Sequence, residues 1–266
     1  MKAIILAGGK GTRLAPYTTT LPKPMLPVGE KPILEIIIAQ LAYHGFREIT
    51  LSVGHLAGII KAYFQANGNL PSGVTIKYVH EDSPLGTAAP VSLVPDLHTT
   101  FLVMNGDVLT TLNYGELIRF HKQNGATLTI ATCPRKVPVD IGMVELDGGP
   151  RVVNYREKPT FTYNDSMGIY VYEPSVLKYI EPNVYLDVPT LVNRLIAKGE
   201  RVLAYQSDGA CFWIDMGKHG DYERAIEAFE ARKSQFLPPP NRPPIQSLPH
   251  DPLCAPPARD HLVEAG

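Results

Sequence analysis

Cysteine is scarce in this chain of 266 residues. The only three, Cys133, Cys211 and Cys254, are widely spaced. Their odd number and the lack of a C-x-x-C pair argue against a disulfide framework and against a cysteine-based zinc site. The eight histidines offer no H-x-x-x-H spacing either. We therefore expect a reduced, cytoplasmic protein.

Long apolar runs and an excess of one charge are also missing. No stretch approaches the ~18 uninterrupted apolar residues of a membrane span. The run at 3–7 stops at Gly8 without a cleavage pattern, so it predicts a buried strand and not a signal peptide. The 25 basic and 26 acidic residues give a net charge of -1. This balance argues against nucleic acid or a membrane surface as a partner, although local cations can still hold an anionic substrate.

Strand and helix signals alternate along most of the chain. Apolar runs predict strands at 2–7, 48–53, 74–80, 100–104, 126–132, 141–146, 151–156, 166–172, 201–206 and 211–214. Helical spacing and caps predict helices at 32–44, 56–66, 87–94, 113–125, 187–198 and 219–235. The alternation predicts an α/β fold, a Rossmann-like three-layer sandwich with a mainly parallel, mixed central sheet, and the dense strands between 126 and 172 predict a small β-rich insertion.

Proline gathers at the C-terminal end, with nine prolines between residues 238 and 257. Proline lacks the amide donor that helices and central strands need. We therefore predict one domain over 1–236 and an extended or disordered proline-rich tail over 237–266. The run at 238–240 could dock an aromatic groove as a polyproline helix, but a simple linker or tail is the interpretation we favour.

The strongest local signal follows the first predicted strand, in the stretch Leu6-Ala-Gly-Gly-Lys-Gly-Thr-Arg-Leu14. Its glycines let backbone N–H groups approach a ligand closely, and Arg13 and Lys23 add two cations. Such a set is typical of a polyphosphate cradle. It differs from the Walker pattern because Thr12 and Arg13 follow Gly11, and from the dinucleotide pattern because Leu14 replaces the third glycine.

The stretch 4–34 resembles the signature of the nucleotidylyltransferases that make NDP-sugars. Three further motifs agree with that family, namely Asn105-Gly106-Asp107, Glu157-Lys158-Pro159 and Phe212-Trp-Ile-Asp-Met-Gly217. The resemblance covers about residues 1–232. It implies transfer of a nucleoside monophosphate from an NTP to a sugar 1-phosphate with Mg²⁺, release of pyrophosphate, and a possible homo-oligomer.

The resemblance also implies residue roles. Arg13 would grip the β- and γ-phosphates, Lys23 would contact the α-phosphate, and Asp107 and Asp215 would hold Mg²⁺. The nucleotide would be bound by Leu6, Ala7, Gly8, Gly9, Gly11, Thr12, Glu81, Pro84, Gly86, Thr87, Asn105 and Gly106. The sugar phosphate would be bound within the β-rich insertion and the strand that follows it, by Gly142, Glu157, Lys158, Ser166 and Gly168.

One departure and one similarity bear on the substrates. The strand at 166–172 begins Ser166-Met-Gly168, where the family often has Asn-Ala-Gly, so the sugar is left open. The stretch 84–88, Pro-Leu-Gly-Thr-Ala, is most similar to mannose- and heptose-1-phosphate guanylyltransferases and favours GTP.

Other interpretations stay open for single motifs. Asn-Gly-Asp at 105–107 is also good turn chemistry, and Lys158 alone would be an ordinary surface lysine. A regulatory or scaffold subunit that binds nucleotide-sugars is the alternative for the whole chain, and Ser166 is the one feature that favours it. Such subunits tend to lose the cations and carboxylates of the site. This chain keeps all four of them, which favours an enzyme, namely Arg13, Lys23, Asp107 and Asp215.

Overall fold

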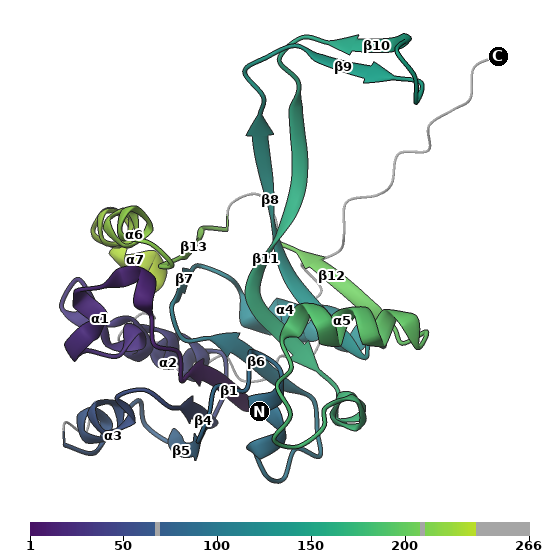
Figure 1. Ribbon diagram of the computed structural model, residues 1–266. Coiled ribbons are helices and arrows are strands. Elements are labelled where there is room, and N and C mark those ends of the chain that lie inside the picture. The colour runs from purple at the N-terminus through teal and green to yellow at the C-terminus, as the bar shows by residue number, and fades with distance from the viewer. Residues whose placement is uncertain (67–69, 208–210, 238–266) are drawn as a thin grey trace, which may run out of the picture.

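A seven-stranded sheet forms the centre of the computed structural model, which describes residues 1–66, 70–207 and 211–237 (Figure 1). Its strand order is β12-β8-β11-β6-β1-β4-β5. The bounds are β1 (Lys2–Ala7), β4 (Glu48–Val53), β5 (Thr75–His80), β6 (Phe101–Asn105), β8 (Leu128–Pro138), β11 (Thr160–Tyr172) and β12 (Val202–Gln206). Only β11 pairs antiparallel with its neighbours, so the predicted mainly parallel, mixed sheet is confirmed.

Two apolar cores lie on the two faces of this sheet. Successive residues of β1 show the division, because Ile5 belongs to the core that contains residues of α2, α3, α4 and α6, and Ile4 to the core that contains residues of α5. The helices are α2 (Ile33–Tyr43), α3 (Ala57–Ala66), α4 (Tyr114–Gln123), α5 (Val188–Ala197), α6 (His219–Ala231) and α7 (Lys233–Phe236). The predicted three-layer arrangement is confirmed, and none of these described helices is long and apolar enough to cross a bilayer.

The segment between β1 and α2 is built from short elements. It contains the short turns η1 (Thr12–Leu14), α1 (Tyr17–Thr20) and η2 (Lys23–Met25), then the small strands β2 (Pro27–Val28) and β3 (Lys31–Pro32). We call residues 8–29 the signature loop. The helix predicted at 219–235 is in fact two helices, because the backbone leaves the helical region at Arg232.

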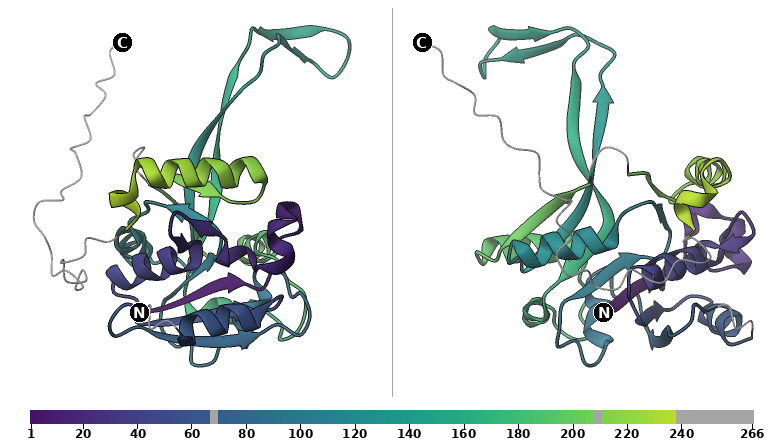
Figure 2. Two further views of the ribbon diagram at one scale, coloured as in Figure 1. Left: turned by 90° about the vertical axis from the view of Figure 1, so that its left-hand side faces the viewer. Right: turned by 180° about the vertical axis from the view of Figure 1, so that it is seen from behind.

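An arm extends from the sheet where β8 and β11 continue beyond it as a two-stranded ribbon (Figures 1 and 2). At its end lies the hairpin of β9 (Met143–Leu146) and β10 (Val152–Arg156). The strands predicted at 126–132 and 166–172 were too short for β8 and β11, whereas those predicted at 141–146 and 151–156 correspond to β9 and β10. The prediction for β8 ended early because Pro134 and Pro138 follow, and proline is rare inside sheets. Proline is tolerated here because one edge of the strand is unpaired.

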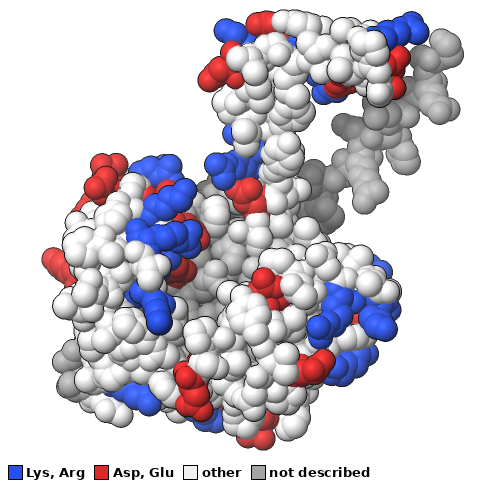
Figure 3. Space-filling view, in the orientation of Figure 1, with Lys and Arg blue, Asp and Glu red and all other residues white. Residues whose placement is uncertain are grey.

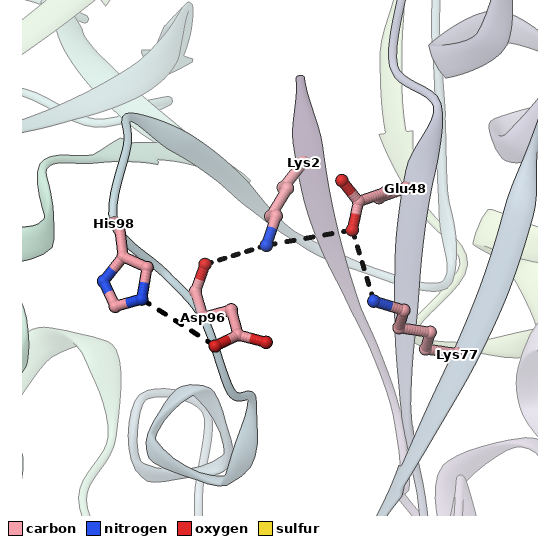
Figure 4. Close-up of polar contacts among 5 residues, drawn as sticks. All are labelled: Lys2, Glu48, Lys77, Asp96 and His98. Atoms are coloured by element: carbon pink, nitrogen blue, oxygen red, sulfur yellow. Dashed lines mark hydrogen bonds and ion pairs between the residues drawn. The ribbon is translucent and has the colours of Figure 1, made fainter.

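The edge of the sheet opposite the signature loop is held by charged side chains (Figure 4). Lys2 at the start of β1 lies 3.8 Å from Glu48 at the start of β4, and Glu48 lies 3.3 Å from Lys77 of β5. Lys2 also donates to the Asp96 carbonyl, and the Asp96 carboxylate lies 3.8 Å from His98. Exposed pairs of this kind contribute about 0–1 kcal/mol each, so they align the strands without dominating stability.

The tail predicted over 237–266 is described at its first residue only. Leu237 is partly buried and packs against the apolar core, and 238–266 lies outside the described residues.

Candidate active site

The signature loop turns back on itself directly after β1. Gly11 adopts a left-handed conformation (φ 62°), and the Thr18 hydroxyl donates to its carbonyl at 2.9 Å. A Cβ at Gly11 would lie 3.1 Å from Cβ of Lys23 and 3.0 Å from the Thr18 methyl group. Glycine is needed here on both counts, because the turn is left-handed and closely packed. The turn therefore places Lys23 beside the glycines.

The Asn105-Gly106-Asp107 turn follows β6, which lies next to β1 in the sheet. The Gly106 amide donates to the Leu6 carbonyl at 2.9 Å, and a Cβ at Gly106 would be 2.9 Å from that same oxygen. The absence of a side chain thus lets the two strand ends approach each other. This approach carries Asp107 to the signature loop, at the carboxyl edge of the sheet where α/β folds bind ligands.

A second carboxylate reaches the same place from far along the chain. β13 (Trp213–Asp215) pairs antiparallel with β7 (Val108–Thr110), and this register sets Asp215 opposite Val108. The Met216 amide then donates to the Asp107 carbonyl at 3.2 Å. The small β7–β13 sheet therefore brings the two predicted metal carboxylates together.

Lys23 joins these carboxylates. Its ammonium is bonded to Oδ2 of Asp107 and lies 3.6 Å from Oδ1 of Asp215. Arg13 lies close by, because a Cβ at Gly217 would be 3.6 Å from Asp215 Oδ1 and 3.8 Å from Arg13 Nη1. We call Arg13, Lys23, Asp107 and Asp215 the charged cluster.

Burial and the neighbouring charge of Asp107 raise the pKa of Asp215, while Lys23 and Arg13 oppose that rise. Oδ1 of Asp215 is buried and accepts no hydrogen bond among the described residues. Burial, together with repulsion between the two carboxylates, thus outweighs the opposing effect of the two cations. A further cation at this point would relieve the repulsion.

The cluster fits a hard divalent cation bound together with substrate. Among the described residues, no group of three or more histidine, cysteine or acidic side chains is placed to hold a metal. Mg²⁺, however, usually takes only one or two carboxylates and completes its shell with water and phosphate oxygens. Asp107 and Asp215 supply two carboxylates, and the buried Oδ1 of Asp215 accepts no hydrogen bond, with the Lys23 ammonium 3.6 Å away.

The segment after β5 lies against the glycines of the signature loop. Glu81 accepts hydrogen bonds from the Ser52 hydroxyl (2.8 Å) and the Leu85 amide (3.4 Å). Its Oε1 would lie 2.6 Å from a Cβ at Gly8. The structure thus brings Glu81, the first of the nucleotide residues predicted at 81–87, to Gly8, and its carboxylate is engaged within the protein. Sequence reasoning missed Ser52, whose signal is a single hydroxyl in the otherwise apolar stretch 51–53.

The predicted sugar-phosphate residues fall into two groups. The first lies at the Asn105-Gly106-Asp107 turn, since Gly168 (φ 70°) is so close to Asn105 that a Cβ would be 2.6 Å from the side-chain nitrogen Nδ2 of Asn105. Its amide donates to Ser166 Oγ at 3.4 Å, and Ser166 Oγ lies 3.1 Å from the Tyr170 hydroxyl. Trp213 is half-buried, packs against the apolar core, and donates to the Met167 carbonyl at 2.9 Å.

The second group lies where the arm joins the β9–β10 hairpin. Tyr155 donates to Glu157 at 2.9 Å, and its hydroxyl fills the space beside Gly142. Lys158 follows in a left-handed conformation (φ 43°). No described hydrogen bond or ion pair joins this group to the charged cluster, and in Figures 1 and 2 the arm holds the hairpin away from the sheet. The structure therefore brings Gly142 and Glu157 together without bringing them to Lys23.

The face of the molecule below the arm is recessed. Figure 3 shows lysine and arginine side chains gathered along the wall of this recess on the side of α1 and α6, with some acidic side chains among them. Cations on such a wall suit a ligand that carries phosphate, and the partly buried carboxylates of Asp107 and Asp215 suit a metal ion that accompanies it.

Known proteins resemble this chain over most of its length. A uridylyltransferase named for UTP and glucose 1-phosphate, from Synechocystis sp. (strain ATCC 27184 / PCC 6803 / Kazusa), is 34% identical over 253 residues, which are 88% of this chain and 64% of the relative. The catalytic subunit beta of mannose-1-phosphate guanylyltransferase from Danio rerio is 32% identical over 84% of this chain and 62% of its own. The chain thus spans less than two thirds of the length of these curated relatives.

Solved structures share the fold. HddC from Yersinia pseudotuberculosis superposes with a TM-score of 0.66 at 25% identity, covering 86% of this chain and 99% of that one. A putative glucose-1-phosphate thymidylyltransferase from Bacillus anthracis gives a TM-score of 0.68 at 24% identity, covering 89% and 98%. The model of the nucleotidyl transferase family matches residues 2–232, the stretch that holds the whole charged cluster, and the chain belongs to that family.

Proposed function

We propose that this protein transfers a nucleoside monophosphate from an NTP to a sugar 1-phosphate, forming an NDP-sugar and releasing pyrophosphate. The observation that carries the proposal is the charged cluster. Lys23 is bonded to Asp107, lies 3.6 Å from Asp215, and is set beside a glycine-rich turn at the carboxyl edge of the sheet. Cations, two carboxylates and exposed backbone amides are what a polyphosphate–metal complex requires.

The reaction requires few catalytic groups beyond the charged cluster. The attacking oxygen of a sugar phosphate is already anionic near neutral pH, so no general base is needed. Catalysis of phosphoryl and nucleotidyl transfer is then mostly positioning and neutralisation of charge. Arg13 would hold the departing pyrophosphate, and Lys23 would stabilise charge at the α-phosphate.

Mg²⁺ is the cofactor that we assign to the Asp107 and Asp215 carboxylates. When bound, it would neutralise the negative charge that the triphosphate and the two carboxylates share. In the structure the Lys23 ammonium lies at both carboxylates. We expect Lys23 to turn toward the α-phosphate once a metal ion neutralises the pair.

GTP is the nucleotide that we favour, because the stretch 84–88 resembles guanylyltransferases and the Danio rerio relative carries that name. UTP is the competing candidate, because the Synechocystis relative is named for it. Discrimination between bases rests on a few hydrogen bonds, so the choice between GTP and UTP has to be made by an activity assay. The sugar is not assigned, since Ser166 replaces the asparagine common in the family and is bonded to Tyr170.

Pyrophosphate release tests the proposal. Purified protein is assayed with Mg²⁺ on a matrix of GTP, UTP, ATP, CTP and dTTP against a panel of sugar 1-phosphates. We expect release that depends on one nucleotide–sugar pair and that disappears in Lys23→Met, which keeps the length of the side chain without its charge. Glu48→Gln, at the opposite edge of the sheet, is the control that should retain activity.

Silence over the whole matrix, with binding of NDP-sugars by calorimetry, would reject the enzyme and support the regulatory or scaffold subunit. The intact cluster of two cations and two carboxylates argues against that alternative.

A further inference from the structure

The segment between η4 (Pro174–Tyr179) and α5 pairs with the loop that follows β5. We call residues 84–88 the base loop. The Leu186 amide donates to the Leu85 carbonyl at 2.9 Å, and the Leu186 carbonyl accepts from the Ala88 amide at 2.9 Å and the Ala89 amide at 3.1 Å. Both Leu85 and Leu186 are buried in the same apolar core. The base loop is therefore built against the start of α5.

At Gly86 the two paired segments pack closely. Its backbone is left-handed (φ 87°), and a Cβ would lie 2.5 Å from the Leu186 carbonyl oxygen. No side chain larger than hydrogen fits at that distance. The course of the base loop at Gly86 is thus set by the backbone of residue 186.

Thr87 completes the attachment at the first turn of α5. Asp187 is the N-cap of this helix, and its carboxylate accepts from the Thr190 amide at 3.2 Å. The Val188 amide, one of the donors that a helix leaves without an intrahelical partner, is bonded instead to Thr87 Oγ1 at 2.9 Å. The hydroxyl of Thr87 therefore acts as a second cap.

We infer that Thr87 is a positioning residue, and that the segment 186–188 sets how the base loop recognises the nucleobase. This inference rests on the proposed function, because it assigns the base to that loop. The loop is also tied to the nucleotide side of the site, where Glu81 contacts both the Leu85 amide and the position of Gly8. A shift of the loop at Thr87 therefore moves the groups that face the base, while the charged cluster is left in place.

The test separates recognition of the base from recognition of the phosphates. Isothermal calorimetry measures the Kd of GTP, UTP and inorganic tripolyphosphate, which has no base, for wild type, Thr87→Val and Thr87→Ser. Valine removes the acceptor at nearly equal volume, and serine keeps it. Loss of one such hydrogen bond should weaken NTP binding about five- to tenfold in Thr87→Val, with tripolyphosphate within about twofold of wild type.

Thr87→Ser should stay within about twofold of wild type for all three ligands, since it preserves the hydrogen bond. Thr99→Val is the matched control, because Thr99 is exposed and its hydroxyl has no described partner. Thermal melts check folding, and Thr87→Ala replaces the valine variant if the latter does not fold. The ratio of GTP to UTP affinity should also change in Thr87→Val and not in Thr99→Val.

Equal losses for NTP and tripolyphosphate, or unchanged NTP binding in Thr87→Val, would overturn the inference. So would a wild type that binds NTP no more tightly than tripolyphosphate, since the base loop would then contribute nothing. A wild type that binds NTP but releases no pyrophosphate would reject the proposed function alone, because the affinity ratios still decide the role of Thr87.

Discussion

The Tyr222 hydroxyl donates a hydrogen bond of 2.7 Å to the Pro27 carbonyl, and so ties α6 to the end of the signature loop. Tyr17, earlier in the same loop, packs its ring at 5.9 Å from that of Tyr222 and 5.7 Å from that of His219. The helix that follows Asp215 thus holds the loop that carries Lys23. We therefore expect the distance between Lys23 and Asp215 to depend on this contact.

Tyr222→Phe should therefore lower activity more than stability. Loss of one neutral hydrogen bond costs about 1 kcal/mol of folding free energy. The freed loop should also reduce kcat several-fold, because Lys23 is less well placed. Tyr179→Phe is the control, since it loses a hydrogen bond to Glu200 away from the site and should lower only the melting temperature. Equal kcat in both variants would contradict the positioning role of Tyr222.

Asp215→Asn should stabilise the metal-free protein while abolishing pyrophosphate release. The pKa of Asp215 is raised by burial and by Asp107, so its ionised form costs stability in the folded state at neutral pH. That cost is present above the raised pKa and disappears as the pH falls through it. Thermal melts over a pH series should show a higher Tm for the variant at neutral pH and convergence in acid.

Mg²⁺ provides a second readout of the same residue. It should raise the Tm of wild type, because it relieves repulsion between the carboxylates, and raise that of Asp215→Asn much less. A variant that melts below wild type at neutral pH without metal would contradict this account.

His44 should make the protein less stable in mild acid. Its ring packs edge-on against Tyr114, Nδ1 is buried without a hydrogen-bond partner, and burial lowers the pKa of His44 to about 4. Between pH ~6.5 and ~4, His44 is protonated in the unfolded chain but neutral in the folded chain. The free energy of unfolding therefore falls by up to ~1.4 kcal/mol for each pH unit by which the pH is lowered.

Urea unfolding at several pH values measures this slope for wild type and His44→Asn, with the exposed His98→Asn as control. His44→Asn should flatten the slope only in part, because burial also lowers the pKa of His121. An unchanged slope in His44→Asn would show that His44 is protonated alike in both states.

Gly168→Ala should damage the site beyond its backbone strain. Gly168 is left-handed (φ 70°), and a Cβ would lie 2.6 Å from the side-chain nitrogen Nδ2 of Asn105. Asn105 is two residues before Asp107 in the chain. Gly199→Ala is a matched control, since Gly199 has the same conformation (φ 71°) and open space around it. Each variant should lose about 1 kcal/mol of stability, while only Gly168→Ala loses most of its kcat. Equal kcat in the two variants would show that Asn105 tolerates displacement.

Local sequence patterns predicted most of the fold. Apolar runs such as 2–7 and 48–53 became strands at those positions, and Asn113 caps α4 by accepting from the Glu116 amide, as predicted. These signals are short-range, because strand and helix periodicity and caps depend on neighbours within a few residues. The arm was underestimated for the same reason, since a proline such as Pro134 is read locally as a break.

The sequence by itself determined the kinds of group at the site: glycines after a buried strand, two cations, and carboxylates in turn motifs that resemble one family. Only the tertiary structure decided which of them meet. Lys23, Asp107 and Asp215 converge because β6 lies beside β1 and β13 pairs with β7. Thr87 is bonded to Val188. Such contacts join segments far apart in the chain, and no local pattern records them, because the packing of the whole sheet and its two cores decides which loops become neighbours.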